Sequence, residues 1–386
     1  MHRAAIIGAG HTRFGVLEAG PRALLSTAVG EALASVDRNL ERSQVQEAFL
    51  ATLGFGGWQI GNASAALAEE SGRVGIPVTR IENACASGGF AIRAAVRAVE
   101  RGDRDVVLVA GLEKMTDVPN ARRRYWLGVS GDTEWERLAG LTFAGVYGLI
   151  ASLYLAEHRV GPEALAEVAV KNHENGGLNP NAQFRNALRR DDVLRAPRVA
   201  EPLGLLDCCP VSDGAAALLI TRDDLASRFT DTPVHIDGTG AGSDYLAVQE
   251  REHITHFDAS RRAAEEAFRE AGVARKAISL LEVHDCFTIA ELLALEDLGF
   301  AGDGEAAGLT LSGATRRTGR LPVNPDGGLK AKGHPIGATG VSQAYEVFVQ
   351  LRRQAGARQV PGAERALTHN VGGSGASAAV TLYSVG

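Results

Sequence analysis

The chain repeats one order of predicted elements in its two halves. In the first half, Cys85 is followed by a Gly-rich turn, a predicted helix that reaches Arg101 and the strand-like run DVVLVAGLE. In the second half, His334 is followed by the turn GATG, a predicted helix over residues 341–354 and the run RALTHNVGG. Two further Ala/Leu/Val-rich runs match each other, GAAALLITR and ASAAVTLYS. Two βαβ-type halves of this kind predict a layered α/β fold in which helices cover the sheets.

One block of the chain has no counterpart in this repeat. Residues 114–209 are richer in Asn and Arg, and we predict that they form an inserted loop domain. The N-terminal half would then comprise residues 1–113 and 210–230, and the C-terminal half residues 231–386. The short segment around Pro233 is the predicted link between the halves.

The run KAKGHPIGATG, residues 330–340, places a single histidine among glycines. Pro335 stiffens the backbone next to His334, and glycines allow a backbone to approach a ligand closely. A surface turn before a helix would show the same turn chemistry. Two other reactive motifs far away in the sequence complement this histidine chemically, so we predict that it is catalytic.

The first of these motifs is NACASGG, residues 83–89, which precedes an Ala-rich segment with arginines at every fourth position. The pattern predicts a helix with one buried face and one solvated basic stripe, formed by Arg93, Arg97 and Arg101. Cys85 would stand at the helix N-terminus, where a thiolate is favoured. The alternative is that Cys85 is a small buried hydrophobic residue.

The second motif is LLEVHDCF, residues 280–287, which predicts a buried strand that ends in polar residues. Ligands gather at strand ends in α/β sheets. His284 and Cys286 could also be two metal ligands, but no further ligand stands close by in the sequence. Cys208 and Cys209 are adjacent to each other and poorly placed to chelate together, so we predict no metal site.

Composition is that of a large globular enzyme with 386 residues, 45% hydrophobic and 22% charged. The net charge of −6 gives no reason to expect a nucleic acid or an anionic membrane as a partner. Four cysteines without disulfide-like spacing indicate a reducing compartment. No signal peptide or peroxisomal tripeptide is recognisable, and we expect a cytoplasmic protein.

The segment 138–156 carries no charge over a length that could span a bilayer. Glycine, serine, threonine and tyrosine dilute its hydrophobicity, and no other segment reaches spanning length. We therefore predict a buried helix that lines a pocket.

NACASGG, HDCF and GHPIGATG, in this order, resemble the motifs of the thiolase family along essentially the whole chain. Most thiolases carry an acid/base cysteine in a C-terminal Cys-x-Gly motif and read Asn-Glu-Ala-Phe at the strand end. Here the C-terminal motif is Asn370-Val371-Gly372, and Cys286 has appeared at the strand end instead. This paired change is similar to the branch typified by the thiolase domain of sterol carrier protein 2, although we expect no sterol-carrier domain. The resemblance implies a five-layered α-β-α-β-α sandwich with an inserted loop domain.

The same resemblance implies a role for each reactive residue. Cys85 matches the nucleophile that becomes acylated, and His334 matches the histidine that takes its proton. Cys286 would be the second acid/base. Backbone N–H groups of Cys85 and Gly372 would form one oxyanion hole, and His284 and His334 would form the other. The implied reaction, in lipid metabolism such as fatty acid β-oxidation, is thiolytic cleavage of 3-ketoacyl-CoA or the reverse Claisen condensation.

Coenzyme A and acyl-CoA are expected as substrates, not as permanently bound cofactors. Arg122, Arg123 and Arg124 could reach the phosphates of coenzyme A from the loop domain, with a solvated basic run as the alternative. Asn370 is a further candidate for a substrate contact. By resemblance we expect a homodimer or homotetramer.

Two other functions stay open at the level of sequence. One is a thiolase-like condensing or C-acylating enzyme, or a side-chain retro-aldolase, that acts with a small OB-fold and zinc-ribbon partner protein. Some relatives in this branch associate with such a partner, but the retained Cys85 argues against the retro-aldolase. The other is a non-enzymatic scaffold, against which the filled catalytic positions argue.

Overall fold

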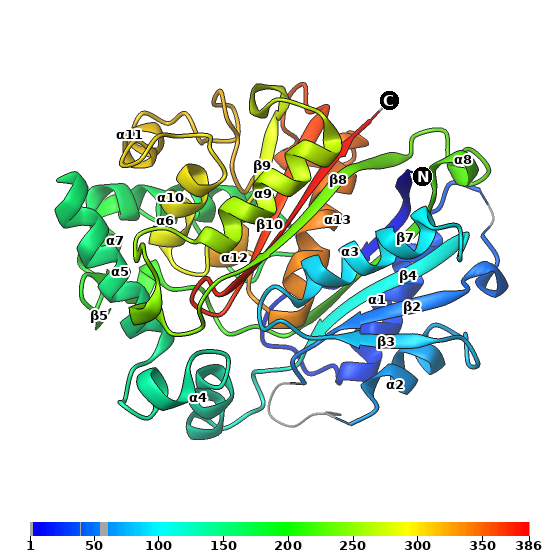
Figure 1. Cartoon of the computed structure of the whole chain (residues 1–386), viewed down its shortest axis with the longest axis horizontal. Helices are drawn as coiled ribbons and strands as arrows, with labels where there is room; N and C mark the ends of the chain where they lie inside the picture. The colour runs from blue at the N-terminus through cyan, green and yellow to red at the C-terminus, as the bar shows by residue number, and fades with distance from the viewer. Residues whose placement is uncertain (1–2, 39, 55–60, 386) are drawn as a thin grey trace.

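The fold is built around a nine-stranded mixed sheet that runs through both halves of the chain (Figure 1). A computed structural model describes residues 3–38, 40–54 and 61–385. The strand order is β3-β2-β4-β7-β1-β8-β11-β10-β9. In chain order the strands are β1 (Ala4–His11), β2 (Glu47–Ala51), β3 (Val78–Ile81), β4 (Val106–Glu113), β7 (Gly214–Arg222), β8 (Val234–Ser243), β9 (Leu280–Glu282), β10 (Arg365–Gly372) and β11 (Ser377–Ser384).

In this strand order, a strand of the first half is hydrogen-bonded to a strand of the second half only between β1 and β8. Three residue pairs form the junction, from Ala4 with Ile236 to Ile6 with Val234. Parallel pairs lie at the two ends of the order, in β3-β2-β4 and in β10-β9, and the pairs between them are antiparallel. The sheets of the two predicted halves are therefore one continuous sheet, which the sequence pattern did not predict.

Helices cover both sides of each half and share a middle layer. Helices α1 (Pro21–Ala34) and α2 (Ala63–Glu70) pack on strands of the first half, and α9 (Asp258–Ala271) packs on β8 and β11. Helices α3 (Ser87–Glu100) and α13 (Thr339–Leu351) contact each other and strands of both halves. One buried cluster joins apolar side chains of α3 and α13 with those of β4, β7, β8 and β11. The helices and the two halves of the sheet therefore alternate in five layers: α1 with α2, the first-half strands, α3 with α13, the second-half strands, and α9. This order confirms the predicted five-layered α/β fold.

The middle layer depends on a close contact between two glycines. A Cβ atom on Gly88 would lie 2.8 Å from Cα of Gly340, and one on Gly340 would lie 2.5 Å from the backbone N of Gly89. Real side chains do not fit at such distances, so α3 and α13 cross with their backbones in contact. Because Gly88 belongs to NACASGG and Gly340 ends GHPIGATG, this crossing brings the two motifs together.

The remaining helices lie mostly to one side of the strands, on the left in Figure 1. Residues 114–209 contribute no strand to the large sheet, although the predicted domain boundaries stay a prediction. This block contains α4 (Asn120–Gly128), α5 (Phe143–His158), α6 (Glu163–Leu178), α7 (Arg190–Leu194) and a small sheet of β5 (Arg198–Ala200) and β6 (Leu203–Gly204). The C-terminal half adds α10 (Thr288–Asp297), α11 (Ala306–Leu311) and α12 (Gly328–Ala331), and α8 (Asp223–Ala226) follows β7.

The prediction for segment 138–156 needs correction. The uncharged segment 138–156 is not one helix, because α5 begins at Phe143 and Leu138 before it is 72% exposed. Within the part of the chain that the structure describes, no helix has the length and apolarity needed to cross a membrane.

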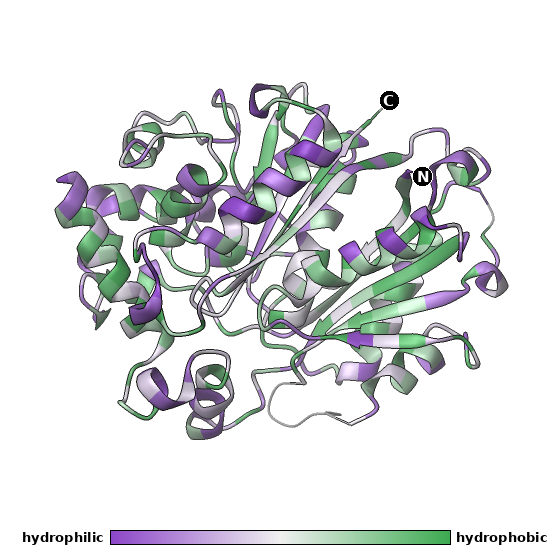
Figure 2. Ribbon diagram, viewed as in Figure 1, coloured by the Kyte–Doolittle hydropathy of each residue, from purple (hydrophilic) through white to green (hydrophobic). Residues whose placement is uncertain are grey.

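The arginine stripe of α3 is not simply solvated. Arg93 and Arg97 form ion pairs with Glu266 and Glu270 of α9, at 2.9 and 2.7 Å. Figure 2 shows hydrophilic residues along α9. The stripe therefore connects α3 to the outer layer of the C-terminal half.

The glycine crossing predicts a specific sensitivity to a single methyl group. Gly340→Ala should lower the free energy of unfolding by about 3 kcal/mol, because overpacking a tight contact displaces backbone on both helices. Gly308→Ala, in α11, is the matched control, since a Cβ there meets nothing within 4 Å. That control should be neutral or stabilising by about 0.5–1 kcal/mol, since alanine replaces glycine in a helix. Urea unfolding of both variants measures the difference, and equal stabilities would contradict a backbone contact.

Candidate active site

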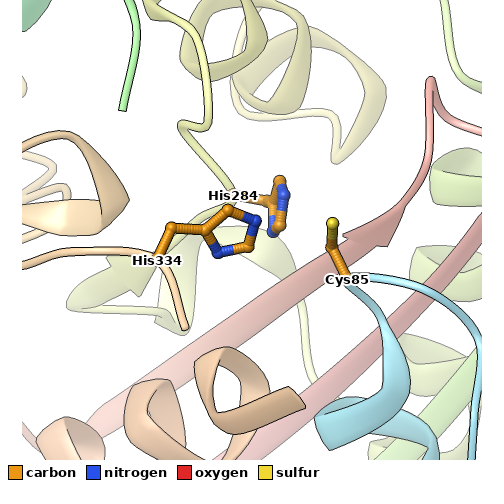
Figure 3. A group of neighbouring side chains, drawn as sticks. All are labelled: Cys85, His284 and His334. Atoms are coloured by element: carbon orange, nitrogen blue, oxygen red, sulfur yellow. The ribbon is translucent and has the colours of Figure 1, made fainter. Parts of the chain in front are cut away.

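Three reactive side chains from the three sequence motifs meet in one place (Figure 3). Cys85 precedes α3, His284 follows β9, and His334 lies between α12 and α13. The Cys85 sulfur and one nitrogen of each imidazole all lie within 4.8 Å of one another. The rings of His284 and His334 stand edge to face with centroids 5.1 Å apart. The structure therefore brings together residues that are about 250 positions apart in the sequence.

A strained turn presents Cys85 to this cluster. Ala84 has φ of 48°, a conformation that costs a non-glycine residue of the order of 1–3 kcal/mol. Ser87 holds the turn, since its hydroxyl donates to the carbonyl of Ala84 at 2.6 Å and accepts from the N–H of Asn83 at 2.9 Å. Strain of this kind is concentrated at functional sites.

Asn370 connects the cysteine turn to His284. Its Oδ1 accepts from the N–H of Gly89 at 3.0 Å, so its Nδ2 must be the donor to the carbonyl of Cys85 at 2.8 Å. The same Nδ2 lies 3.4 Å from Nδ1 of His284. Because Nδ2 can only donate, Nδ1 of His284 is the acceptor, and the neutral ring carries its hydrogen on Nε2. That Nε2–H is buried and has no hydrogen-bond partner within the described chain.

In His334 the hydrogen is on the other ring nitrogen, Nδ1. The hydroxyl of Thr339 donates to the carbonyl of Pro335 at 3.0 Å and lies 2.7 Å from Nδ1 of His334. Thr339 must therefore accept from Nδ1–H, which leaves a lone pair on Nε2 of His334. The backbone N–H of His334 donates to Ser212 at 2.9 Å and fixes the residue further. One imidazole thus offers a proton acceptor and the other a hydrogen-bond donor.

All three groups are electrically neutral at neutral pH. Burial raises the pKa of the Cys85 thiol to about 12, against a hydrogen bond from the backbone of Gly373 that lowers it. Burial lowers the pKa of His334 to about 3 and that of His284 well below its usual value. The expected thiolate at the start of α3 is therefore wrong for the resting protein, because desolvation outweighs the helix N-terminus.

Backbone N–H groups of Gly373 and of Cys85 itself lie close enough to the Cys85 sulfur to lower the pKa of the thiol. Gly372 is the last residue of β10 and pairs with Ser377 of β11. The part of Gly372 in an oxyanion hole stays a prediction.

Cys286 is buried next to the cluster, 7% exposed. Burial raises the pKa of Cys286 well above its usual value, and the nearby hydroxyl of Tyr147 acts against this shift. The Tyr147 hydroxyl also donates to the carbonyl of Gly373 at 3.2 Å. Tyr147, which sequence reasoning did not single out, therefore links Cys286 to the loop that contacts Cys85.

A group of buried polar contacts, which the sequence did not reveal, holds the HDCF motif in place. Asp285 accepts from Nδ2 of Asn172 at 2.7 Å and from the backbone N–H of Leu329 at 2.7 Å. Lys171 forms an ion pair with Glu291 at 3.0 Å, and all of these side chains are buried. Lys171 and Asn172 lie inside α6. Asp285 thus ties HDCF to the segment that leads to His334.

The cluster is compact enough to raise the question of a metal ion, which the spacing of ligands in the sequence did not indicate. A metal needs a lone pair from each imidazole. His334 offers one, but on His284 the lone pair of Nδ1 already accepts from Asn370 and Nε2 carries a hydrogen. This arrangement suits an oxygen atom that carries negative charge better than a cation.

The predicted coenzyme A contacts lie elsewhere. Arg122, Arg123 and Arg124 are on α4, where Arg122 and Arg124 are exposed. Their contact with coenzyme A stays a prediction.

Comparison with known proteins gives the family. Residues 4–224 match the thiolase N-terminal domain, and residues 240–385 match the thiolase C-terminal domain-like family. The chain is 43% identical over 386 residues to an acetyl-CoA acetyltransferase of Methanothermobacter thermautotrophicus, with both chains covered completely. It is 34% identical to human sterol carrier protein 2 over 327 residues, which is 82% of this chain and 60% of the relative. The chain belongs to the thiolase family, and it is an enzyme of the acyltransferase type.

Solved structures agree on the fold. The Ltp2-ChsH2(DUF35) aldolase superimposes with a TM-score of 0.84 at 25% identity, over 98% of this chain and 97% of the other. Human mitochondrial 3-ketoacyl-CoA thiolase superimposes with a TM-score of 0.75 at 18% identity, over 99% and 98% of the two chains.

The raised pKa of Cys85 predicts how fast its thiol reacts with iodoacetamide. The thiolate is the reactive form, so the rate should rise about tenfold per pH unit from pH 7 to pH 10 without levelling off. Peptide mapping of Cys85 measures this rate, with the unfolded protein as a control that levels off near the ordinary thiol pKa. A plateau below pH 8 in the folded protein would show a thiolate at rest and contradict the prediction.

Proposed function

We propose that this chain is an acyl-CoA C-acyltransferase that cleaves 3-ketoacyl-CoA with coenzyme A, or runs the reverse Claisen condensation, through an acyl group on Cys85. The observation that carries the proposal is the opposite orientation of two neutral imidazoles around one thiol. The ring of His334 with a lone pair on Nε2 and the ring of His284 with a hydrogen on Nε2 both lie beside the Cys85 sulfur. The similarity to an acetyl-CoA acetyltransferase along the whole chain supports it.

In the first step His334 acts as the base. Its Nε2 takes the Cys85 proton while the sulfur attacks the 3-keto carbonyl carbon, so the nucleophile becomes charged only as it reacts. The carbonyl oxygen gains negative charge and accepts from backbone N–H groups at the turn, those of Cys85 and the loop at Gly372 and Gly373. Fixed donors at such a position typically contribute about 3 kcal/mol each.

The carbon–carbon bond then breaks, and its electrons move onto the leaving acetyl-CoA as an enolate. The unpartnered Nε2–H of His284 is placed to donate to the enolate oxygen, together with the new Nε2–H of His334. Cys286 gives its proton to the enolate carbon, a role that suits a thiol whose pKa is raised. In the second step the Cys286 thiolate takes the proton of the coenzyme A thiol, whose sulfur attacks the acyl-Cys85 thioester. The bond to Cys85 breaks, the shortened acyl-CoA leaves, and the Cys85 sulfur takes back the proton held by His334. The condensation runs these steps backwards.

Intact mass after incubation with acetyl-CoA tests the nucleophile. We expect one acetyl group on the wild type and on Cys286→Ser, and none on Cys85→Ser. Thiolysis of acetoacetyl-CoA by Cys286→Ser should fall by about 10²–10⁴-fold, the usual loss of a positioned acid/base group. Cys208→Ser, which removes a thiol outside these steps, should keep both adduct and turnover. An adduct that persists in Cys85→Ser would refute the assignment.

A second function has one specific observation in its favour. Among the solved structures compared, the Ltp2-ChsH2(DUF35) aldolase superimposes with the high TM-score of 0.84. This likeness supports a condensing, C-acylating or retro-aldol reaction carried out with a small OB-fold partner, whereas the retained Cys85 argues against the retro-aldolase. The measurement is the acetyl adduct with and without a small OB-fold protein encoded next to this gene. An adduct on the chain alone favours the thiolase, and one that needs the partner favours the second function.

A further inference from the structure

A second cluster of metal-ligating side chains lies outside the Cys85 site. His256 precedes α9, Glu296 lies in the last turn of α10, and Asp303 follows in the loop toward α11. One ligand atom from each residue lies within 4.8 Å of the others. His256 and Glu296 are buried, 8% and 5% exposed, whereas Asp303 closes the cluster from the solvent side.

The hydrogens of His256 are arranged as a metal ligand requires. Nδ1 lies 2.9 Å from Oδ1 of Asp297, whose other oxygen accepts from the backbone N–H of Phe257 at 2.8 Å. A carboxylate can only accept, so Nδ1 carries the hydrogen and Nε2 of the neutral ring keeps a lone pair. That Nε2 lies 3.8 Å from Asp303. Histidines that bind metals usually donate their other N–H to a carboxylate in this way.

Glu296 contributes an oxygen atom that lacks a partner. Its Oε1 accepts from the hydroxyl of Tyr154 at 2.6 Å and from the backbone N–H of Ala306 at 3.1 Å. Its Oε2 is buried without a hydrogen-bond partner among the residues that the structure describes. Buried carboxylate oxygens are rarely left in this state, because desolvation without compensation is costly.

The charges around the cluster also favour a cation. Three carboxylates lie in or next to the cluster, those of Glu296, Asp297 and Asp303, and the guanidinium of Arg261 pairs with two of them. Arg261 lies 3.1 Å from Asp297 and 3.5 Å from Asp303, so it compensates only part of this charge. The carbonyl end of α10 adds further negative potential at Glu296.

We propose that His256, Glu296 and Asp303 bind one divalent metal cation. One imidazole nitrogen and two carboxylate oxygens form a donor set that suits Mn²⁺ or Zn²⁺, with water in the remaining positions. The contrast with the Cys85 cluster is direct, since Nε2 carries a hydrogen on His284 and a lone pair on His256.

A cation here would connect the start of α9 with the end of α10 and the loop after it. Helix α10 begins at Thr288, directly after the HDCF motif. The ion would therefore stabilise the outer layer against which this helix packs. Ligands that bind only the folded state raise the unfolding temperature in proportion to the logarithm of their concentration.

Mn²⁺ is the probe for the test, because carboxylate and imidazole ligands suit it and a thiol such as Cys85 does not. Titration of the metal-free protein followed by electron paramagnetic resonance counts the bound ions, since free Mn²⁺ alone gives the sharp six-line signal. We expect one ion per chain, at least tenfold weaker binding in Asp303→Asn and in Glu296→Gln, and a rise in unfolding temperature that Asp303→Asn abolishes. Asp303 is 68% exposed, so its variant should fold.

Two further variants complete the test. Glu252→Gln removes a carboxylate that is 83% exposed and outside the trio, and Cys85→Ser removes the thiol of the active site. Both should bind Mn²⁺ within about twofold of the wild type. No binding up to millimolar Mn²⁺ would overturn the proposal and leave Arg261 and a protonated His256 as the groups that neutralise the carboxylates. Unchanged binding in Asp303→Asn would overturn it as well.

Discussion

The contact between the backbones of Gly88 and Gly340 is the constraint on which the site depends. It places the first turn of α3 against the first turn of α13, and each turn carries one of the reactive motifs. Asn370 then fills the remaining space, with its oxygen on α3 and its nitrogen on the Cys85 carbonyl. Distances around Cys85 are therefore set by packing of main chain in the middle layer, where little can move.

Burial gives the site a particular electrostatic state. Desolvation keeps the thiol protonated and both imidazoles neutral, so no charge is held in the cluster before a substrate enters. Hydrogen bonds with Thr339 and Asn370 determine which nitrogen carries the hydrogen in His334 and in His284, respectively. The chemistry of the cluster is thus specified by neutral hydrogen-bonding partners, in a setting where an unbalanced charge would be costly.

Much of this architecture could be predicted from the sequence. The duplicated pattern and the apolar runs indicate the layers, and HDCF lies at the end of β9 as its strand pattern predicts. The junction of β1 with β8 could not be predicted, because three residue pairs leave no periodic signal. The burial of Lys171 and Asn172 could not be predicted for a related reason: polar residues in a helix predict solvent exposure, and their partners Glu291 and Asp285 come from distant segments. The protonation state of Cys85 depends on its surroundings, whereas local sequence reveals only its place before a helix.

Asn370 stands where the motif resemblance places a cysteine in most thiolases, and its contacts show what a cysteine there would cost. The asparagine contacts Gly89, the Cys85 carbonyl and His284, so a cysteine in its place would leave a buried N–H and a buried carbonyl without these partners. The side chain is thus part of the scaffold that holds the Cys85 turn. A return to cysteine at this position would disturb the framework of the fold, whatever chemistry the new thiol could perform.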